Sequence, residues 1–247
     1  MNRLEGKTAF VTGGSRGIGR AIALAFAAEG AKVAVVYHAH EEAAVEVQKE
    51  IIRKGGEALV VQADIANSAQ IRAAIQFVIE QWGRVDILVN DAAITHDKTL
   101  RKMTDEDWRE VIDTNLNGVF YATSAVIPSM IANQYGRIIN ISSYTGHYGN
   151  FGQANYGAAK AGVIGLTKTA ALELAKYQIT VNAICPGYTE TDMMATIPSN
   201  IREQLTARIP VGRFATPEEI AWGAVFLAAD TGFVTGQEIG INGGMGM

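Results

Sequence analysis

The chain has 247 residues, of which 48% are hydrophobic and 19% charged, and its formal net charge is −4 at pH 7. This composition supports a folded domain with a real core and argues against a surface for nucleic acid or anionic membranes. The single cysteine, Cys185, excludes an internal disulfide and fits a reducing compartment. No signal-peptide pattern and no run of about 18 apolar residues is present, so we expect a cytoplasmic protein.

Strand-like apolar runs alternate with helical patterns along the chain. The strand-like runs are 8–12, 32–37, 57–64, 85–90, 137–142, 180–186 and 238–242, and the helix-like segments are 18–29, 41–54, 68–82, 105–131, 155–176 and 217–229. Continuous apolar strands separated by helices are typical of a parallel sheet covered on both faces. No linker or repeat interrupts the pattern, which predicts one α/β domain over 1–247, of the doubly wound Rossmann type, with a seven-stranded parallel sheet flanked by helices.

A glycine-rich turn, VTGGSRGIGRAIA, follows the first strand and opens the first helix. Gly13 permits a tight turn, Gly17 lets the backbone approach a pyrophosphate, and Gly19 allows the helix to pack closely on the strand. Tight strand–helix turns also occur without ligands, but the position in an alternating chain favours a dinucleotide site at the helix N-terminus. The predicted cofactor contacts of this loop are Gly13, Ser15, Arg16, Gly17, Ile18 and Gly19.

The end of the second strand bears on the choice between NAD and NADP. NAD-preferring proteins of this architecture place an acidic residue there, whereas this chain has Tyr37 and His38. Arg16, in the glycine-rich loop, could pair with a ribose 2′-phosphate or could be a solvated loop charge. Together these features favour NADP(H), with His38 as a further contact.

Tyr156 and Lys160 are four residues apart and share one face of a predicted helix. A free phenol has a pKa of about 10, and a nearby ammonium favours the phenolate, so Lys160 is expected to lower the pKa of Tyr156. Such pairs are also common on solvated helix faces. Ser143 stands upstream at the end of a strand, where this architecture builds its sites, and the three residues together favour a catalytic role.

Residues 187–215 form the least regular part of the chain, with Pro198 and Pro210 among several polar residues. This segment follows the C-terminal end of a strand, where such folds bind ligands. We therefore predict a lid on the substrate side, with a plain surface excursion as the alternative.

These motifs together resemble the short-chain dehydrogenase/reductase family over essentially the whole chain. The resemblance rests on TGGSRGIG at 12–19, NDAA at 90–93, Asn115 in DTNLNGVF, Ser143 in NISS, YxxxK at 156–160, PGYTETDM at 186–193 and NGGM at 242–245. In such a reductase Ser143 would donate a hydrogen bond to the substrate carbonyl oxygen and Tyr156 would deliver the proton. The resemblance implies that Lys160 also holds the nicotinamide ribose and that Asn115 supports a water-linked proton relay. Ser142 would point to the opposite side of the strand.

The resemblance also implies further cofactor contacts. Asp64 and Ile65 would flank the adenine, Asn90 would lie at the adenosine ribose, and Ala92 would follow it. Pro186, Gly187 and Thr191 would lie by the nicotinamide. The family usually reads NNAG at 90–93, so Asp91 and Ala93 are departures. If the usual glycine needs a positive φ, Ala93 would strain the loop.

Acetoacetyl-CoA reductases and 3-oxoacyl-[acyl-carrier-protein] reductases are the most similar members. Phe151 in FGQANY favours the CoA enzymes, and we expect Phe151, Gln153 and Tyr188 around the acyl group, with Ser143 and Tyr156 at the carbonyl. Acyl carrier protein is acidic and its partners present basic patches. The segments 133–135 and 176–178, where the carrier-protein enzymes tend to carry arginines, contain only Lys176.

The predicted reaction is the NADPH-dependent reduction of acetoacetyl-CoA to (3R)-3-hydroxybutyryl-CoA, which would supply polyhydroxyalkanoate precursors. Reduction of a 3-oxoacyl-[acyl-carrier-protein] in fatty acid synthesis is the alternative. A regulator that binds NADPH without catalysis is an alternative of another class. The resemblance implies a homotetramer, and we expect no metal ligand, nucleic-acid partner or membrane partner.

Overall fold

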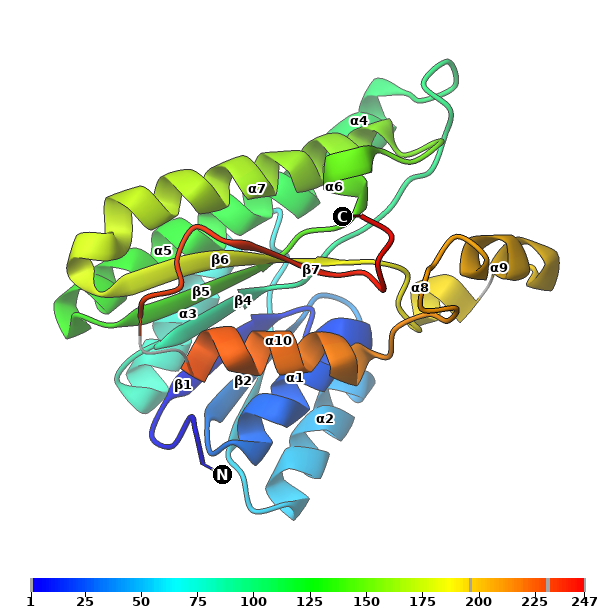
Figure 1. Ribbon diagram of the computed structural model, residues 1–247. Helices are drawn as coiled ribbons and strands as arrows, with labels where there is room; N and C mark the ends of the chain where they lie inside the picture. Colours follow the sequence, from blue (N-terminus) through cyan, green and yellow to red (C-terminus); the bar gives the residue numbers. More distant parts are fainter. Residues whose placement is uncertain (1, 196, 230–231, 247) are drawn as a thin grey trace.

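One parallel sheet organises the structure, a computed structural model that describes residues 2–195, 197–229 and 232–246 (Figure 1). The seven strands of the described residues lie in the order β3-β2-β1-β4-β5-β6-β7. They are β1 (Thr8–Thr12), β2 (Lys32–Tyr37), β3 (Ala58–Gln62), β4 (Ile87–Asn90), β5 (Gly136–Ile141), β6 (Ile179–Pro186) and β7 (Glu238–Ile241). All pairings are parallel, and the strand order reverses between β1 and β4. The predicted doubly wound Rossmann-type fold is confirmed.

Helices cover both faces of the sheet (Figure 1). One face packs against α1, α2 and α10 through residues such as Phe26, Ile51 and Val225. The other packs against α3, α5 and α7 through residues such as Ile75 and Leu174. These helices are α1 (Gly17–Ala28), α2 (Glu41–Arg53), α3 (Ser68–Trp82), α5 (Gly118–Asn133), α7 (Ala154–Leu174) and α10 (Pro217–Ala229). The central strands are mostly apolar because both of their faces are buried.

The helix predicted over 105–131 contains an irregularity that the sequence pattern did not indicate. It begins as α4 (Asp105–Ile112), passes through the π-helical turn η1 (Asp113–Asn117) and continues as α5. The backbone N–H of Gly118 donates to the carbonyl of Asp113, five residues earlier. Short π-helical turns are frequent at functional sites, and this one contains Asn115.

The segment 187–215 leaves the sheet after β6, and its two ends lie next to each other. A parallel bridge between Thr189 and Ala215 closes its base, and Glu190 N–H donates to the Ala215 carbonyl at 2.9 Å. Between these points lie α8 (Asp192–Ala195) and α9 (Ser199–Thr206), and α9 projects away from the sheet (Figure 1). Two further short helices, α6 (Thr145–Tyr148) and η2 (Ala175–Tyr177), flank α7. Within the described residues, no helix is both long and apolar enough to cross a membrane.

Candidate active site

A cavity of about 820 Å³ opens at the edge of the sheet where the parallel strands end. It lies over the point where the strand order reverses, the usual ligand position in this architecture. Most of the residues singled out from the sequence line it, although they come from the ends of six strands and from α7. They are Gly13, Ser15, Arg16, Gly17, Ile18, His38, Asp64, Ile65, Ala92, Ser143, Gln153, Tyr156, Lys160, Pro186, Gly187, Tyr188 and Thr191.

The glycine-rich loop forms a cradle of bare backbone at the start of α1. Gly13 and Gly17 have φ of +68° and +52°, a conformation that favours glycine. A Cβ on Gly13 would lie 2.9 Å from Cα of Ala92, and a Cβ on Gly17 would lie 3.3 Å from Cγ2 of Thr191. Arg16 precedes the helix without a side-chain capping bond, which leaves the N–H groups of Gly17 and Ile18 to a ligand. The cradle therefore fits the pyrophosphate of a dinucleotide.

Gly19 has a packing role in the same loop. A Cβ on this residue would lie 2.3 Å from the Gly13 carbonyl oxygen, so only glycine lets α1 approach β1 this closely. Gly19 does not line the cavity.

Arg16 and His38 border the end of the cavity next to β2. The Arg16 guanidinium lies 3.8 Å from the Asp192 carboxylate, and half of its side-chain surface is exposed. An exposed pair at this distance holds the side chain weakly, so Arg16 is able to turn toward a phosphate. The first acids after β2 along the chain, Glu41 and Glu42, lie in the first turn of α2, where carboxylates favour the helix dipole.

Strand β5 and helix α7 bring Ser143, Tyr156 and Lys160 to one wall of the cavity. Lys160 is almost fully buried, and its ammonium donates to the carbonyl of Ile141 at 2.7 Å. The same nitrogen lies 5.6 Å from the centroid of the Tyr156 ring. The Ser143 hydroxyl oxygen accepts a bond from Thr145 N–H at 3.1 Å, which orients it after the end of β5. Ser142 is buried and donates to the Lys160 carbonyl at 2.9 Å.

The electrostatics of Tyr156 differ from the expectation. Burial raises the pKa of the phenol to about 12, and its interaction with Ser143 opposes this shift. The net shift is opposite to the predicted lowering, and Lys160 is not among the groups that act on the pKa of Tyr156. The Lys160 ammonium donates to the Ile141 carbonyl, and burial lowers its own pKa to about 8. A phenol with a raised pKa is protonated at neutral pH and is available as a proton donor.

Asp91 is a site residue that the sequence reasoning missed. Its carboxylate faces Gly19 at the start of α1 and accepts that residue's backbone N–H. Burial raises the pKa of Asp91 to about 7, and the ammonium of Lys160 opposes this rise. In the sequence, the only sign of this role is that Asp91 replaces an asparagine of the NNAG pattern. The electrostatic interaction of Asp91 with Lys160 of α7 exists only in the folded chain.

The neighbouring departure from the family pattern carries no strain. Among the described non-glycine residues, positive φ occurs at Gln134 and Gln178 and not at Ala93. The concern that Ala93 would strain the loop is therefore wrong.

Two asparagines predicted at the site lie behind the cavity wall. Asn90 is buried, and its amide donates to the side-chain oxygen of Asn140 at 2.8 Å, so its side chain ties β4 to β5. Its place at the adenosine ribose stays a prediction. Asn115 is also buried. Its amide oxygen accepts from Ile94 N–H at 2.9 Å and its amide nitrogen donates to the Ile94 carbonyl at 2.8 Å. Both of these polar groups of Asn115 therefore hold the loop after β4.

The three residues expected around the acyl group have different positions. Phe151 is 88% exposed and does not line the cavity, contrary to the prediction of an aromatic wall. It follows Gly149, which ends α6 with a φ of +70°, on an outer loop. Gln153 does line the cavity, but its amide donates to Asp97 at 2.9 Å. Tyr188 lines the cavity and stacks on Phe214 with ring centroids 5.5 Å apart.

Comparison with known proteins agrees with this geometry. A family model described as "Enoyl-(Acyl carrier protein) reductase" matches residues 13–246. The chain belongs to the short-chain dehydrogenase/reductase family. A 3-oxoacyl-[acyl-carrier-protein] reductase of Synechocystis is 49% identical over the full length of both chains. Proteins of the same name from Staphylococcus aureus and Thermotoga maritima are 48% and 47% identical, over 98% of this chain and 98% and 99% of theirs.

Proposed function

We propose that this short-chain dehydrogenase/reductase uses NADPH to reduce the ketone of a 3-oxoacyl thioester to the (3R)-3-hydroxyacyl product. The observation that carries the proposal is the shared cavity of Ser143, Tyr156 and Lys160 with the bare-backbone loop at the start of α1. The names of the relatives support a thioester on acyl carrier protein as the main substrate. This reverses the preference for acetoacetyl-CoA that the sequence alone suggested.

The residues of the cavity have separate roles in this reaction. The nicotinamide, when bound, supplies hydride to the ketone carbon, so negative charge develops on the ketone oxygen. Ser143 donates a hydrogen bond to this oxygen, and Tyr156, which is protonated at neutral pH, delivers the proton. Lys160 provides a buried positive charge beside them. Asn115 fixes the loop after β4 through Ile94, and we retain its predicted part in a proton relay as a proposal.

The NADPH preference rests on the border of the cavity next to β2. Arg16 and His38 line this border, and Tyr37 ends the strand where a carboxylate would favour NAD. A guanidinium that is free to turn offers a paired hydrogen bond to a 2′-phosphate. We therefore propose NADP(H) as the cofactor.

Acetoacetyl-CoA remains a second candidate because basic residues are sparse where carrier protein would bind. Of the segments 133–135 and 176–178, only the second contributes a cation, Lys176. Phe151 no longer supports the CoA substrate as a wall of the acyl site, since it is exposed.

The deciding experiment compares kcat/KM for acetoacetyl-CoA and acetoacetyl-[acyl-carrier-protein], following NADPH oxidation by absorbance. We expect the carrier-protein substrate to have the higher kcat/KM. A higher value for acetoacetyl-CoA would select the second candidate. Tight NADPH binding without turnover of either thioester would show a regulator instead of an enzyme.

A further inference from the structure

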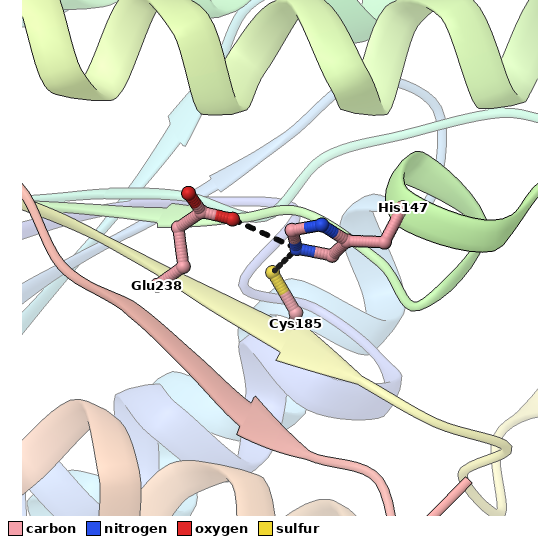
Figure 2. Close-up of side chains that lie close together, drawn as sticks. All are labelled: His147, Cys185 and Glu238. Atoms are coloured by element: carbon pink, nitrogen blue, oxygen red, sulfur yellow. Dashed lines mark hydrogen bonds and ion pairs between the residues drawn. The ribbon is translucent and has the colours of Figure 1, made fainter. Parts of the chain in front are cut away.

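Three side chains with different donor atoms lie close together in a second place in the fold (Figure 2). His147 extends from α6, Cys185 from β6 and Glu238 from β7. The His147 Nε2 lies 2.8 Å from the Glu238 carboxylate and 3.6 Å from the Cys185 sulfur. One nitrogen, one sulfur and one oxygen thus all lie within 4.8 Å of one another.

The arrangement does not suit a cysteine nucleophile. In a nucleophilic triad the imidazole contacts the nucleophile with one nitrogen and the carboxylate with the other. Here the same nitrogen, Nε2, faces both the sulfur and the carboxylate (Figure 2).

Three donor atoms this close together fit the ligand set of one metal ion. Zinc binds cysteine sulfur at about 2.3 Å and histidine nitrogen or carboxylate oxygen at about 2.0–2.2 Å, usually with tetrahedral geometry. Ligand atoms of such a site are separated by roughly 3.3–3.7 Å. The 3.6 Å between Cys185 Sγ and His147 Nε2 fits this range. The 2.8 Å between His147 Nε2 and the Glu238 carboxylate is shorter, so a small rotation of the Glu238 side chain is needed for both to bind one ion.

We propose that His147, Cys185 and Glu238 form a binding site for a divalent transition metal of the zinc class. Mixed sulfur, nitrogen and oxygen donors favour such a cation over magnesium or calcium, which prefer oxygen alone. With three protein ligands, a fourth position remains for water on the side where His147 is 37% exposed.

Lys168 holds the carboxylate of Glu238 in position for metal binding. The Lys168 ammonium lies 2.5 Å from one oxygen of Glu238, and the other oxygen faces His147. Groups that hold ligating side chains in place commonly strengthen a metal site. Lys168 therefore orients the carboxylate and leaves one oxygen available to the cation.

The proposed metal would join elements that border the active site. His147 lies four residues after Ser143, and Cys185 directly precedes Pro186 of the cavity wall. The Tyr144 N–H already donates to the Pro186 carbonyl at 2.9 Å, so α6 and the end of β6 are neighbours. Metal binding would fix α6 against β6 and β7. This inference is independent of the proposed reductase activity.

Cobalt(II) binding tests the proposal directly, because Cys185 is the single cysteine of the chain. Cobalt(II) added to the metal-free full-length protein should produce a thiolate-to-metal charge-transfer band in the near ultraviolet and visible bands of tetrahedral intensity. Zinc should displace the cobalt and raise the midpoint of thermal unfolding. Absence of the charge-transfer band would overturn the proposal.

Ligand substitutions complete the test. Cys185→Ser should abolish the band, and His147→Gln and Glu238→Gln should weaken zinc affinity at least about tenfold in competition with a chromogenic chelator. His96→Gln is the matched control, since His96 has the same 37% exposure and pairs with Glu110 at 3.0 Å. Equal affinity in His147→Gln and the wild type, or equal losses in His147→Gln and His96→Gln, would contradict the assignment. The surface position of His147 keeps this comparison valid even if Cys185→Ser folds poorly.

Discussion

The buried position of Tyr156 raises the pKa of its phenol, which favours a role as proton donor in a reduction. Burial raises the pKa of its phenol to about 12, so the phenol is protonated at neutral pH, as the proposed role of proton donor requires. Replacing Tyr156 by Phe should preserve NADPH binding, measured by nucleotide fluorescence, and lower kcat by about 10²-fold or more. Turnover close to that of the wild type would refute the assignment of the acid.

Asp91 gives a second test at the residue scale, through the pH dependence of activity. Its pKa, raised to about 7, means that it becomes ionised above neutrality, where it favours the charged form of Lys160. The Gly19 N–H donates to Asp91 and lowers the pKa of its carboxyl group. Cys185, like Asp91, raises the pKa of Lys160. Burial lowers the pKa of Lys160 to about 8, so its charge is lost as the pH rises through that value.

Asp91→Asn should therefore lower the pKa of Lys160 further. The alkaline limb of the kcat/KM profile for NADPH-dependent reduction should move to lower pH, while the two proteins converge below neutrality, where Asp91 is protonated in the wild type. Superimposable profiles would show that Asp91 does not act on Lys160.

Arg16 decides the cofactor preference in the proposed function. Arg16→Ala should raise KM for NADPH about tenfold and leave KM for NADH nearly unchanged, because only NADPH carries the 2′-phosphate. Arg20→Ala is the control, since Arg20 lies one turn later on α1 and pairs with Glu50 at 2.7 Å. An equal change in KM for both nucleotides would contradict the role of Arg16.

At the scale of elements, α3 illustrates how local chemistry starts a helix. The Asn67 side chain accepts bonds from Ala69 N–H and Gln70 N–H, and Gly83 ends the helix with a φ of +83°. Asn67→Ala should lower the free energy of unfolding by about 1 kcal/mol, measured by urea denaturation. Ser68→Ala, at the next position, should have a smaller effect. Equal effects of the two substitutions would show that the cap does not stabilise α3.

The long helix from α4 to α5 is interrupted by a π-helical turn that its sequence pattern does not predict. Its apolar periodicity predicts a continuous helix, and the chain is indeed helical from Asp105 to Asn133. The π-helical turn at η1 lies where the Asn115 amide oxygen accepts from Ile94 N–H and its amide nitrogen donates to the Ile94 carbonyl. Such a turn is stabilised by a contact between distant segments, so its position does not follow from periodicity.

At the scale of the whole molecule, exposed apolar side chains indicate how copies would assemble. Trp222 and Phe226 on α10 are 73% and 52% exposed, and Phe120 on α5 and Leu172 on α7 are 51% and 84% exposed. Large exposed apolar residues commonly mark protein interfaces. Two such surfaces on one chain support the predicted homotetramer, which we retain as a proposal.

Trp222→Glu should break one of these interfaces and reduce the mass measured by light scattering from that of a tetramer to that of a smaller assembly. Ile52→Glu, on α2 and 55% exposed, is the control outside both surfaces and should leave the mass unchanged. A monomeric wild-type protein, or a tetrameric Trp222→Glu variant, would contradict this assembly.

Much of the fold could be predicted because it depends on local patterns. The apolar runs of β1, β2 and β6 and the glycines of the first loop determine a parallel sheet and a nucleotide cradle, and most predicted site residues reach one cavity. Strand ends and turn geometry follow from nearby residues, so spacing along the chain is sufficient.

The tertiary structure decided what depends on the surroundings of a side chain. Burial is the largest cause of the raised pKa of Tyr156, and the buried Asp91 carboxylate raises the pKa of Lys160. The side chain of Phe151 is exposed to solvent and does not form part of the predicted acyl site. The His147 cluster joins residues from α6, β6 and β7 that no spacing connects. Charge, burial and coordination depend on distances between segments, and these distances exist only when the chain is folded.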